Sequence, residues 1–262
     1  MQRSFSMTDT AVSDHLRKNY ADYYAEGDSE WRWLGALDKA ENVIALCGDV
    51  SHRTILEVGA GEGSVLKRLS DRGFGEELCA LEISPTGVQT IMNKQIPQLK
   101  ECRLFDGYAI PYEDHAFDLV ILSHVIEHVE HPRKLLYEAA RVARHLFVEV
   151  PLEETMRMKS DFVFDKVGHI NVFTPKTIRW LLQTCPLEIL NQTVTIPSKA
   201  VYLYRNKSWG GAALSREGIV AKALTPSGHV SFYVPLRPAL SSQELGKKGA
   251  RPACYSFLEL LK

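Results

Sequence analysis

Residues 54–69, TILEVGAGEGSVLKRL, predict a strand, a glycine turn and the start of a helix in direct succession. The first residues are apolar, as in a buried strand, and Ser64 opens a run with helical spacing. Gly59, Gly61 and Gly63 lie between the two. Glycines at such a turn let a small ligand approach the backbone N–H groups at the helix start. The segment therefore predicts a ligand site at the carboxyl end of a strand.

The spacing Gly-x-Gly-x-Gly differs from the Gly-x-Gly-x-x-Gly of dinucleotide-binding turns, and Ser64 stands where that pattern has its third glycine. Glu57 also lies two residues before the first glycine, where its carboxylate would repel a pyrophosphate. A positively charged ligand fits this turn better. A nicotinamide-dependent dehydrogenase is therefore an alternative that the spacing argues against.

A second predicted strand, residues 77–82, ends in an acid roughly 20 residues after the glycine turn, where doubly wound folds hold a ribose diol. Ile83 follows, and Ser84 and Pro85 have the residue types of a helix N-cap and first position. We expect Glu82 to bind a ribose, with an ordinary solvated acid as the structural alternative. Further strands are predicted at residues 103–105, 119–122, 145–150, 187–196 and 254–260.

Together these motifs resemble the class I S-adenosylmethionine-dependent methyltransferases, in the broad branch that acts mostly on small molecules. The matching stretches, in the family's order, are residues 57–63, 81–85, 106, 109–112 with 116–120, and 126–129. The resemblance implies an α/β fold with a doubly wound, seven-stranded and mostly parallel sheet. It also implies S-adenosylmethionine as the cofactor.

The resemblance also assigns parts of the cofactor to positions of this chain. It places the methionine part at the glycine turn, the ribose at Glu82, the adenine amino group at Asp106 beside Gly107, and the methyl side over Ser123 and His124. The full set of residues expected to bind the cofactor is Glu57, Gly59, Ala60, Gly61, Gly63, Glu82, Ile83, Asp106, Gly107, Ser123, His124 and Tyr24.

Residues 124–128, HVIEH, concentrate ligand-type side chains directly after the predicted fourth strand. Some quinone-biosynthesis and RNA-end methyltransferases that look similar here hold Mg²⁺ with an acid-rich version of this turn. His124 replaces one such acid, and imidazole suits a hard cation poorly. The pattern also matches that of some zinc peptidases, whose helical context is absent here. We therefore expect no bound metal.

Methyl transfer from a sulfonium is an in-line displacement, so most of the acceleration comes from holding the nucleophile close to the methyl carbon. A base is needed only where the acceptor loses a proton, and histidine suits that task. His169, His128 and His124 are the candidate catalytic residues, with His169 preferred as the general base. For His128, hydrogen bonding to the adjacent loop is the structural alternative.

The chain is expected to consist of four parts: a helical lid at 1–50, a methyltransferase core at 51–196, an insertion on the substrate side at 197–252, and a final strand at 253–262. In proteins that resemble this one, such an N-terminal segment folds over the cofactor. Tyr20, Tyr23 and Tyr24 would then line the site from above.

With 45% hydrophobic and 24% charged residues, the composition is that of a globular protein. No apolar run approaches the roughly 18 residues that span a bilayer, and the first residues lack the apolar core of a signal peptide. The five cysteines are scattered without a Cys-x-x-Cys spacing, as expected for buried residues in a reducing compartment. We therefore expect a cytosolic protein without membrane contact.

The predicted function is methyl transfer to an oxygen or nitrogen of a small-molecule acceptor. From Pro197 on, ten Lys or Arg stand against three Glu, which suits an acidic acceptor. An RNA methyltransferase that uses this basic third is the enzymatic alternative, with nucleic acid as the less favoured partner. A module that binds the cofactor without transferring the methyl group is the non-enzymatic alternative.

Overall fold

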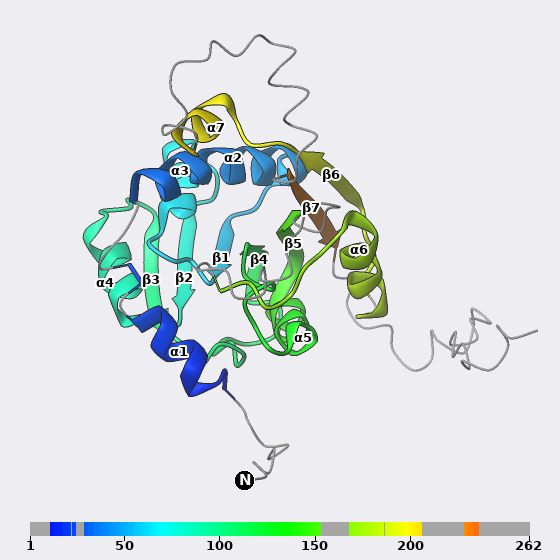
Figure 1. Ribbon diagram of the computed structural model, residues 1–262, viewed down its shortest axis with the longest axis horizontal. Helices are drawn as coiled ribbons and strands as arrows, with labels where there is room; N and C mark the ends of the chain where they lie inside the picture. The colour runs from blue at the N-terminus through cyan, green and yellow to red at the C-terminus, as the bar shows by residue number, and fades with distance from the viewer. Residues whose placement is uncertain are drawn as a thin grey trace, which may run out of the picture.

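A seven-stranded sheet runs through the computed structural model of the protein, with helices on both faces (Figure 1). The structure describes residues 11–21, 23–24, 29–152, 168–185, 187–205 and 228–235. The elements in chain order are α1 (Asp14–Ala21), α2 (Ser29–Cys47), β1 (Thr54–Val58), α3 (Ser64–Asp71), β2 (Glu77–Glu82), α4 (Pro85–Asn93), β3 (Leu99–Leu104), β4 (Phe117–Ser123), α5 (Pro132–Val142), β5 (Ala143–Leu152), α6 (Pro175–Thr184), β6 (Asn191–Thr195), α7 (Lys199–Arg205) and β7 (Gly228–Pro235).

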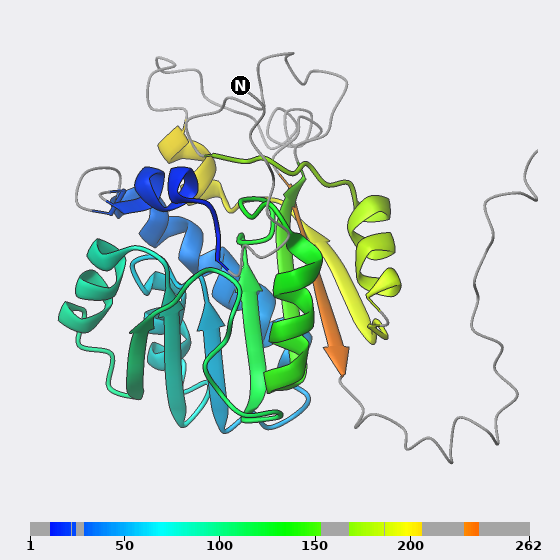
Figure 2. The same ribbon diagram turned by 90° about the horizontal axis from the view of Figure 1, so that it is seen from below.

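The strands lie in the order β3-β2-β1-β4-β5-β7-β6. The first five are parallel, β7 is antiparallel to β5, and β6 is antiparallel to β7. The strand order reverses between β1 and β4, and ligands of doubly wound sheets bind at the carboxyl ends beside such a point. Figure 2 shows α1, in dark blue, at these carboxyl ends, and β7, in orange, running the opposite way. The predicted fold is confirmed.

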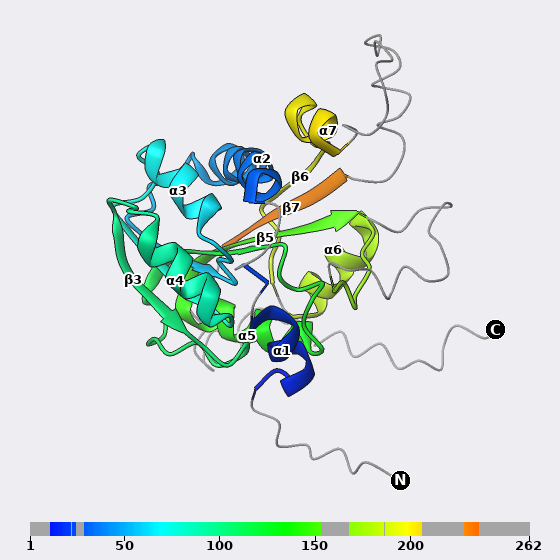
Figure 3. The same cartoon turned by 60° about the vertical axis from the view of Figure 1, so that its left-hand side comes forward.

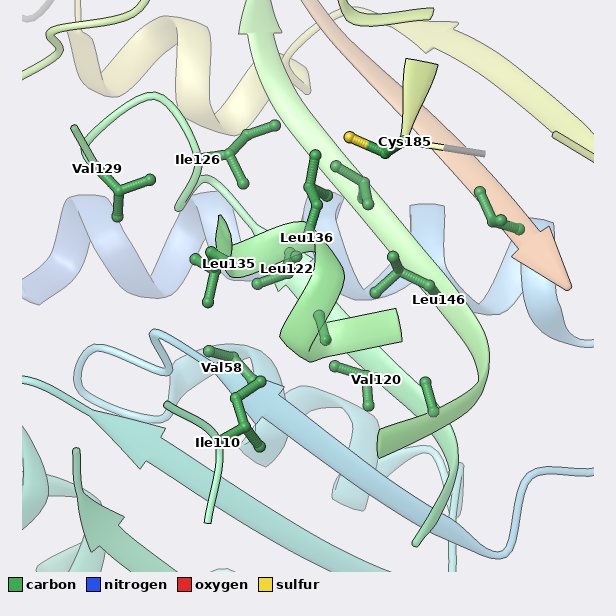
Figure 4. Close-up of a cluster of buried hydrophobic side chains, with 14 of the residues drawn as sticks. Val58, Ile110, Val120, Leu122, Ile126, Val129, Leu135, Leu136, Leu146 and Cys185 are labelled. Carbon is green, nitrogen blue, oxygen red and sulfur yellow. The ribbon is translucent and has the colours of Figure 1, made fainter. Parts of the chain in front are cut away.

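Successive residues of the central strands belong to two separate hydrophobic clusters, because neighbouring side chains of a strand point to opposite faces. Ile55 and Ile121 pack in the cluster that contains residues of α2 and α3. Leu56 and Leu122 pack in the cluster that contains α5, part of which Figure 4 shows. All four side chains are fully buried, which stabilises the fold by about 1.5–3 kcal/mol for each one. The sheet is thus covered on both faces, and its carboxyl edge is left for a ligand.

Two helix starts have the residue types that the sequence predicts for an N-cap and first position, Ser84 with Pro85 and Thr174 with Pro175. The Ser84 side chain caps α4 by accepting a backbone hydrogen bond, and Pro85 occupies the first turn. Thr174 begins α6 with a capping box that it forms with Thr177.

Several strand boundaries differ from the sequence-based prediction. β3 begins at Leu99 and ends at Leu104, whereas 103–105 was expected; it is an edge strand with charged residues, so no apolar run marks it. β5 continues through Pro151. The last residue of β5 that pairs with β4 is Glu149, so the missing N–H of Pro151 interrupts no hydrogen bond between these two strands. β6 begins at Asn191, later than the expected residue 187.

The range 197–252, expected to be an insertion, contributes a strand to the core sheet. β7 pairs with β5 from His145↔Pro235 to Leu152↔Gly228 and with β6 on its other side. It completes the seven strands in the place where we expected residues 254–260. Residues 254–260 lie outside the described residues. So do residues 212–224, for which the sequence predicts a helix.

α7 docks on α2, beside the end of the sheet that carries β7 and β6 (Figure 3). The rings of Trp31 and Tyr204 stack with their centroids 6.3 Å apart, and the Ser198 N–H donates to Asp38 Oδ2 at 2.7 Å. The first residues of the expected insertion are thus attached to the helix layer. Among the described helices, none combines the length and apolar character needed to cross a membrane.

Candidate active site

A cavity of about 220 Å³ lies among the loops that follow β1, β2, β3 and β4, with α1, the tyrosines after it and α2 completing its wall. The residues expected to bind the cofactor that line it are Gly59, Glu82, Ile83, Gly107, His124 and Tyr24. The remaining members of that set, outside its lining, are Glu57, Ala60, Gly61, Gly63, Asp106 and Ser123. His128 and His169 also line the cavity, so all three candidate catalytic histidines border one space.

Glu82, at the end of β2, is anchored to the glycine turn. Its Oε2 accepts the Gly61 N–H at 2.7 Å, and its Oε1 accepts the N–H groups of Ile83 and Ser84 at 2.9 Å each. Burial raises the pKa of Glu82 to about 7, although the three N–H groups act against this shift. Gly61 has φ +60°, and a Cβ there would lie 3.1 Å from Tyr24 Oη, so only glycine fits this approach.

Glu57, at the end of β1, lies next to the start of α3 and is only 2% exposed. Burial raises its pKa to about 8, while the positive charge of Lys39 and a backbone hydrogen bond from Leu66 act in the opposite direction. Its carboxyl group is therefore mostly protonated near neutral pH, and it lies outside the lining of the cavity.

Glu57→Gln is expected to remove much of the pH dependence of stability between pH 6 and 9. A buried carboxyl group with a raised pKa stabilises the fold while it is protonated, and this stability is lost as the pH rises through about 8. For Glu57 the loss over this range is roughly 3 kcal/mol. Thermal unfolding at several pH values should therefore show the melting temperature of the wild type falling roughly 6–12 °C more than that of the variant.

The matched control for this measurement is Glu76→Gln, which removes an exposed acid and should keep the slope of the wild type. Equal falls in melting temperature for the wild type and Glu57→Gln would contradict the prediction.

Tyr20, near the end of α1, and Tyr23 and Tyr24, which follow it, line the cavity. The rings of Tyr23 and Tyr24 lie nearly perpendicular with centroids 5.1 Å apart, and the Arg32 guanidinium lies 5.8 and 5.5 Å from them. Arg32 Nε also lies 2.8 Å from Glu62 Oε2 in the glycine turn. Cation–π contacts and an ion pair thus join these tyrosines, α2 and the turn.

The two parts of the expected lid have different positions: the segment before α1 covers the cavity, and α2 packs on the sheet. The segment before α1 covers the cavity, since the Val12 N–H donates to Asp106 O at 2.9 Å and a Cβ at Gly107 would lie 2.4 Å from Val12 Cγ1. The space at Gly107, expected to face adenine, is therefore filled in part by Val12. α2 instead packs on the sheet through residues such as Val43, and it reaches the cavity with Arg32 and other residues of its first half.

Asp106 shapes the loop after β3. Its Oδ1 accepts the N–H groups of Tyr108 at 2.8 Å and Ala109 at 2.6 Å. Asp106 does not line the cavity, so its expected bond to an adenine amino group stays a prediction.

Ser123, expected beneath the methyl group, belongs to a buried polar network. Glu149 of β5 is fully buried and accepts hydrogen bonds from Ser123 Oγ at 2.6 Å, Ser231 Oγ at 3.0 Å and Asn42 Nδ2 at 2.7 Å. These bonds join β4, β5, β7 and α2 beneath the edge of the sheet. Ser123 therefore has a structural role in this network. Of Ser123 and His124, only His124 lines the cavity.

His124 lies between two buried acids. Its Nε2 is 3.7 Å from Glu149 Oε2, and its Nδ1 is 3.5 Å from Glu127 Oε1. The backbone of His124 has φ +58°, a left-handed conformation that is uncommon outside glycine and that stores about 1–3 kcal/mol of strain. Its N–H donates to Glu149 O at 2.9 Å, which holds this conformation.

His128 and His169 meet with their ring centroids 4.7 Å apart. His128 Nδ1 lies 2.7 Å from Tyr20 Oη and 3.3 Å from Gly168 O. Burial and the neighbouring His169 lower the pKa of His128 to about 3, so its ring is neutral near neutral pH. The hydrogen-bonding alternative for His128 is therefore present in the structure, and His169, 7% exposed, lies beside it.

The sequence did not indicate a role for three residues near the site, which are Arg32, Lys39 and Glu149. A signal for Glu149 is present, because it is a single acid near the end of an apolar strand, as Glu82 is. Arg32 and Lys39 lie on α2, where the sequence does not show which turns border a cavity.

Residues 33–192 match a family described as a methyltransferase domain. The match extends over more than half of the chain and includes the glycine turn, Glu82 and the three histidines. The chain belongs to this family and is a class I S-adenosylmethionine-dependent methyltransferase. The predicted enzyme class and cofactor are confirmed.

Ajmaline N-methyltransferase of Rauvolfia serpentina is 28% identical over 130 residues, which are 44% of each chain. The chain matches less than half of the length of its first curated relatives. The same fold occurs in a complex of the Haloferax volcanii Trm112 methyltransferase activator with a methyltransferase, at TM-score 0.68 and 16% identity over 85% of this chain and 98% of that chain.

The fold also occurs in geranyl diphosphate C-methyltransferase from Streptomyces coelicolor A3(2), solved with Mg²⁺, geranyl-S-thiolodiphosphate and S-adenosyl-L-homocysteine. Its TM-score is 0.65 at 11% identity, over 87% of this chain and all of that one.

Proposed function

We propose that the protein transfers a methyl group from S-adenosylmethionine to an oxygen or nitrogen of a small-molecule acceptor. The observation that carries this proposal is that Glu82, on the nucleoside side, and His124, His128 and His169, on the other side, border the same cavity. An in-line displacement needs the acceptor atom close to the methyl carbon and opposite the sulfur. In a cavity with these two sides, the cofactor and the acceptor would lie next to each other.

On the cofactor side, we assign the ribose hydroxyls to Glu82, because its carboxylate is fixed by three N–H groups and lines the cavity. The methionine part lies along residues 59–63. Arg32 and Lys39 line the cavity and suit its carboxylate. Ile83 then borders the base.

On the acceptor side, we assign the general base to His169 in the metal-free enzyme. It lines the cavity and is held beside His128, whose Nδ1 already contacts Tyr20 and Gly168. A positioned base contributes roughly 10²–10⁴-fold to the rate where the acceptor must lose a proton. His124 also borders the acceptor side of the cavity, together with His128 and His169.

Two observations support a small acceptor. Tyr20 and Tyr23 give the cavity an aromatic wall, which suits the apolar face of a small molecule. Ajmaline N-methyltransferase is named for a small-molecule acceptor. Most of the basic residues behind the RNA alternative lie outside the described residues. The long connection at 152–173, which the sequence predicts to be part of the acceptor pocket, also lies mostly outside them. The cytosolic location stays a prediction.

Incubation of the full chain with methyl-labelled S-adenosylmethionine and a metabolite extract tests this function. Mass spectrometry should find a low-mass metabolite that gains one CH₂ unit together with S-adenosylhomocysteine. Label on RNA or another large polymer, with none on a metabolite, would contradict the small-molecule proposal.

A further inference from the structure

Three ligand-type side chains on the acceptor side of the cavity converge. Glu127, His128 and His169 each offer one ligand atom, and the three atoms all lie within 4.8 Å of one another. Glu127 Oε1 is 3.8 Å from His128 Nε2. Bonds of about 2.0–2.2 Å in tetrahedral zinc sites place ligand atoms about 3.3–3.6 Å apart. Small side-chain rotations would therefore bring these atoms to coordination distance.

We propose that Glu127, His128 and His169 bind one divalent transition-metal ion of the zinc type. Two imidazole nitrogens and one carboxylate oxygen form the ligand set of several catalytic zinc sites, which keep a further position open. Mg²⁺ prefers oxygen ligands and fits this set less well. Because His128 and His169 line the cavity, the ion would border it and could take an acceptor oxygen as its next ligand.

The sequence alone predicts no metal, because His124 takes the place of an acid in the contiguous turn at residues 124–128. The structure brings in His169 from a segment far along the chain and leaves His124 outside the cluster. His124 Nδ1 instead lies 3.5 Å from Glu127 Oε1, where it can orient the carboxylate.

Backbone hydrogen bonds fix the His169 segment against the turn that carries the other two ligands. The N–H groups of Ile170 and Asn171 both donate to Glu127 O at 2.9 Å. Asn171 Nδ2 also donates to Val129 O at 2.8 Å. The three ligands are therefore held in one rigid unit, which lowers the cost of ordering them around an ion.

The surroundings of His128 suit a metal ligand. Its Nδ1 is within hydrogen-bonding distance of Tyr20 Oη and Gly168 O. A carbonyl oxygen only accepts, so a proton on Nδ1 satisfies both contacts and leaves the lone pair on Nε2, the nitrogen that lies near Glu127. Metal-binding histidines commonly donate their other N–H to a carbonyl or carboxylate in this way.

The role of the ion rests on the proposed function. A bound divalent ion lowers the pKa of an acceptor hydroxyl, so its proton passes to water without a free imidazole. The acceptor oxygen then forms a bond to the methyl carbon while the carbon–sulfur bond breaks and S-adenosylhomocysteine leaves. With the ion bound, His169 is a ligand, and it acts as a base only in the metal-free protein.

Metal titration of the full chain, freed of affinity-tag histidines and stripped with a chelator, tests this proposal without measuring methyl transfer. Zn²⁺ in competition with a chromophoric chelator gives the stoichiometry and affinity, and Co²⁺ gives a visible absorption band from its coordination sphere. The variants are Glu127→Gln, which keeps the side-chain shape, and His169→Ala. Their matched controls are Glu130→Gln and His131→Ala, which alter exposed residues of the same turn.

We expect one equivalent of Zn²⁺ in the wild type and both controls, and an affinity at least about 100-fold lower in Glu127→Gln and His169→Ala. Binding of S-adenosylhomocysteine shows that each variant is folded. If one of the two variants does not fold, the zinc affinity of the other tests the proposal. Substoichiometric Zn²⁺ in the wild type, variants that bind like the wild type, or equal affinity for Mg²⁺ and Zn²⁺ would each overturn the proposal. Because turnover is not measured, such a result would leave the methyltransferase proposal standing.

Discussion

Glu82→Ala is expected to weaken the binding of S-adenosylmethionine by at least about 100-fold. A carboxylate that accepts two hydroxyl groups contributes roughly 1.5–3 kcal/mol for each bond, which together correspond to 10²–10⁴ in the dissociation constant. The substitution also releases the Gly61 N–H, so the glycine turn loses its anchor. Isothermal titration with S-adenosylhomocysteine, which does not turn over, measures the effect.

Glu76→Ala is the matched control for Glu82→Ala, because it removes an exposed acid just before the start of the same strand. It should bind S-adenosylhomocysteine like the wild type. Glu82→Gln keeps the side-chain shape and should fall between the two. If Glu82→Ala also keeps wild-type affinity, the ribose does not lie at the end of β2.

His169→Ala is expected to lower kcat by roughly 10²–10⁴-fold and to leave the dissociation constant of S-adenosylmethionine unchanged. His169 borders the acceptor side of the cavity, whereas the anchored acid Glu82 lies on the nucleoside side. Turnover with the acceptor found in the extract, measured beside cofactor titration, separates the two effects. His131→Ala changes an exposed histidine and should keep both values.

The same variant distinguishes a free base from a metal ligand when the assay is repeated on chelator-stripped protein. If His169 acts as a base alone, the kcat of the wild type is the same with and without metal. If a bound ion activates the acceptor, removing the metal lowers the kcat of the wild type and leaves that of the variant unchanged. Unchanged kcat in His169→Ala, with metal present or absent, would contradict both roles.

The glycine turn and Glu82 could be predicted because strand, turn and helix follow one another directly in the chain. Their signals are local: apolar runs, glycines at one spacing and an acid at a strand end. The Ser84 and Thr174 caps were found for the same reason. Local signals of this kind define where a ligand approaches the sheet.

The features that the sequence did not show depend on residues distant in the chain. β7 enters the sheet between β5 and β6, although it follows both in sequence, so its apolar residues looked like part of an insertion. The cluster of Glu127, His128 and His169 forms because backbone bonds to Glu127 O draw in the later segment. The spacing of residues within one motif cannot predict a contact with a residue from a distant segment.

The direction of side chains at the ends of strands also made the site differ from the sequence-based prediction. Ser123 and His124 are neighbours, so one of them enters the buried network around Glu149 while the other borders the cavity. At Gly107, where the resemblance implies an adenine ring, the structure places Val12. The position of a site could thus be predicted more fully than the roles of its individual residues.

Hydrogen exchange of the full chain with and without S-adenosylhomocysteine tests the central claim, that the cofactor occupies this cavity. We expect slower exchange at residues 59–63, at Ile83 and across α1, because the ligand contacts the glycine turn and is covered by α1. Binding without slower exchange at these three places would contradict it.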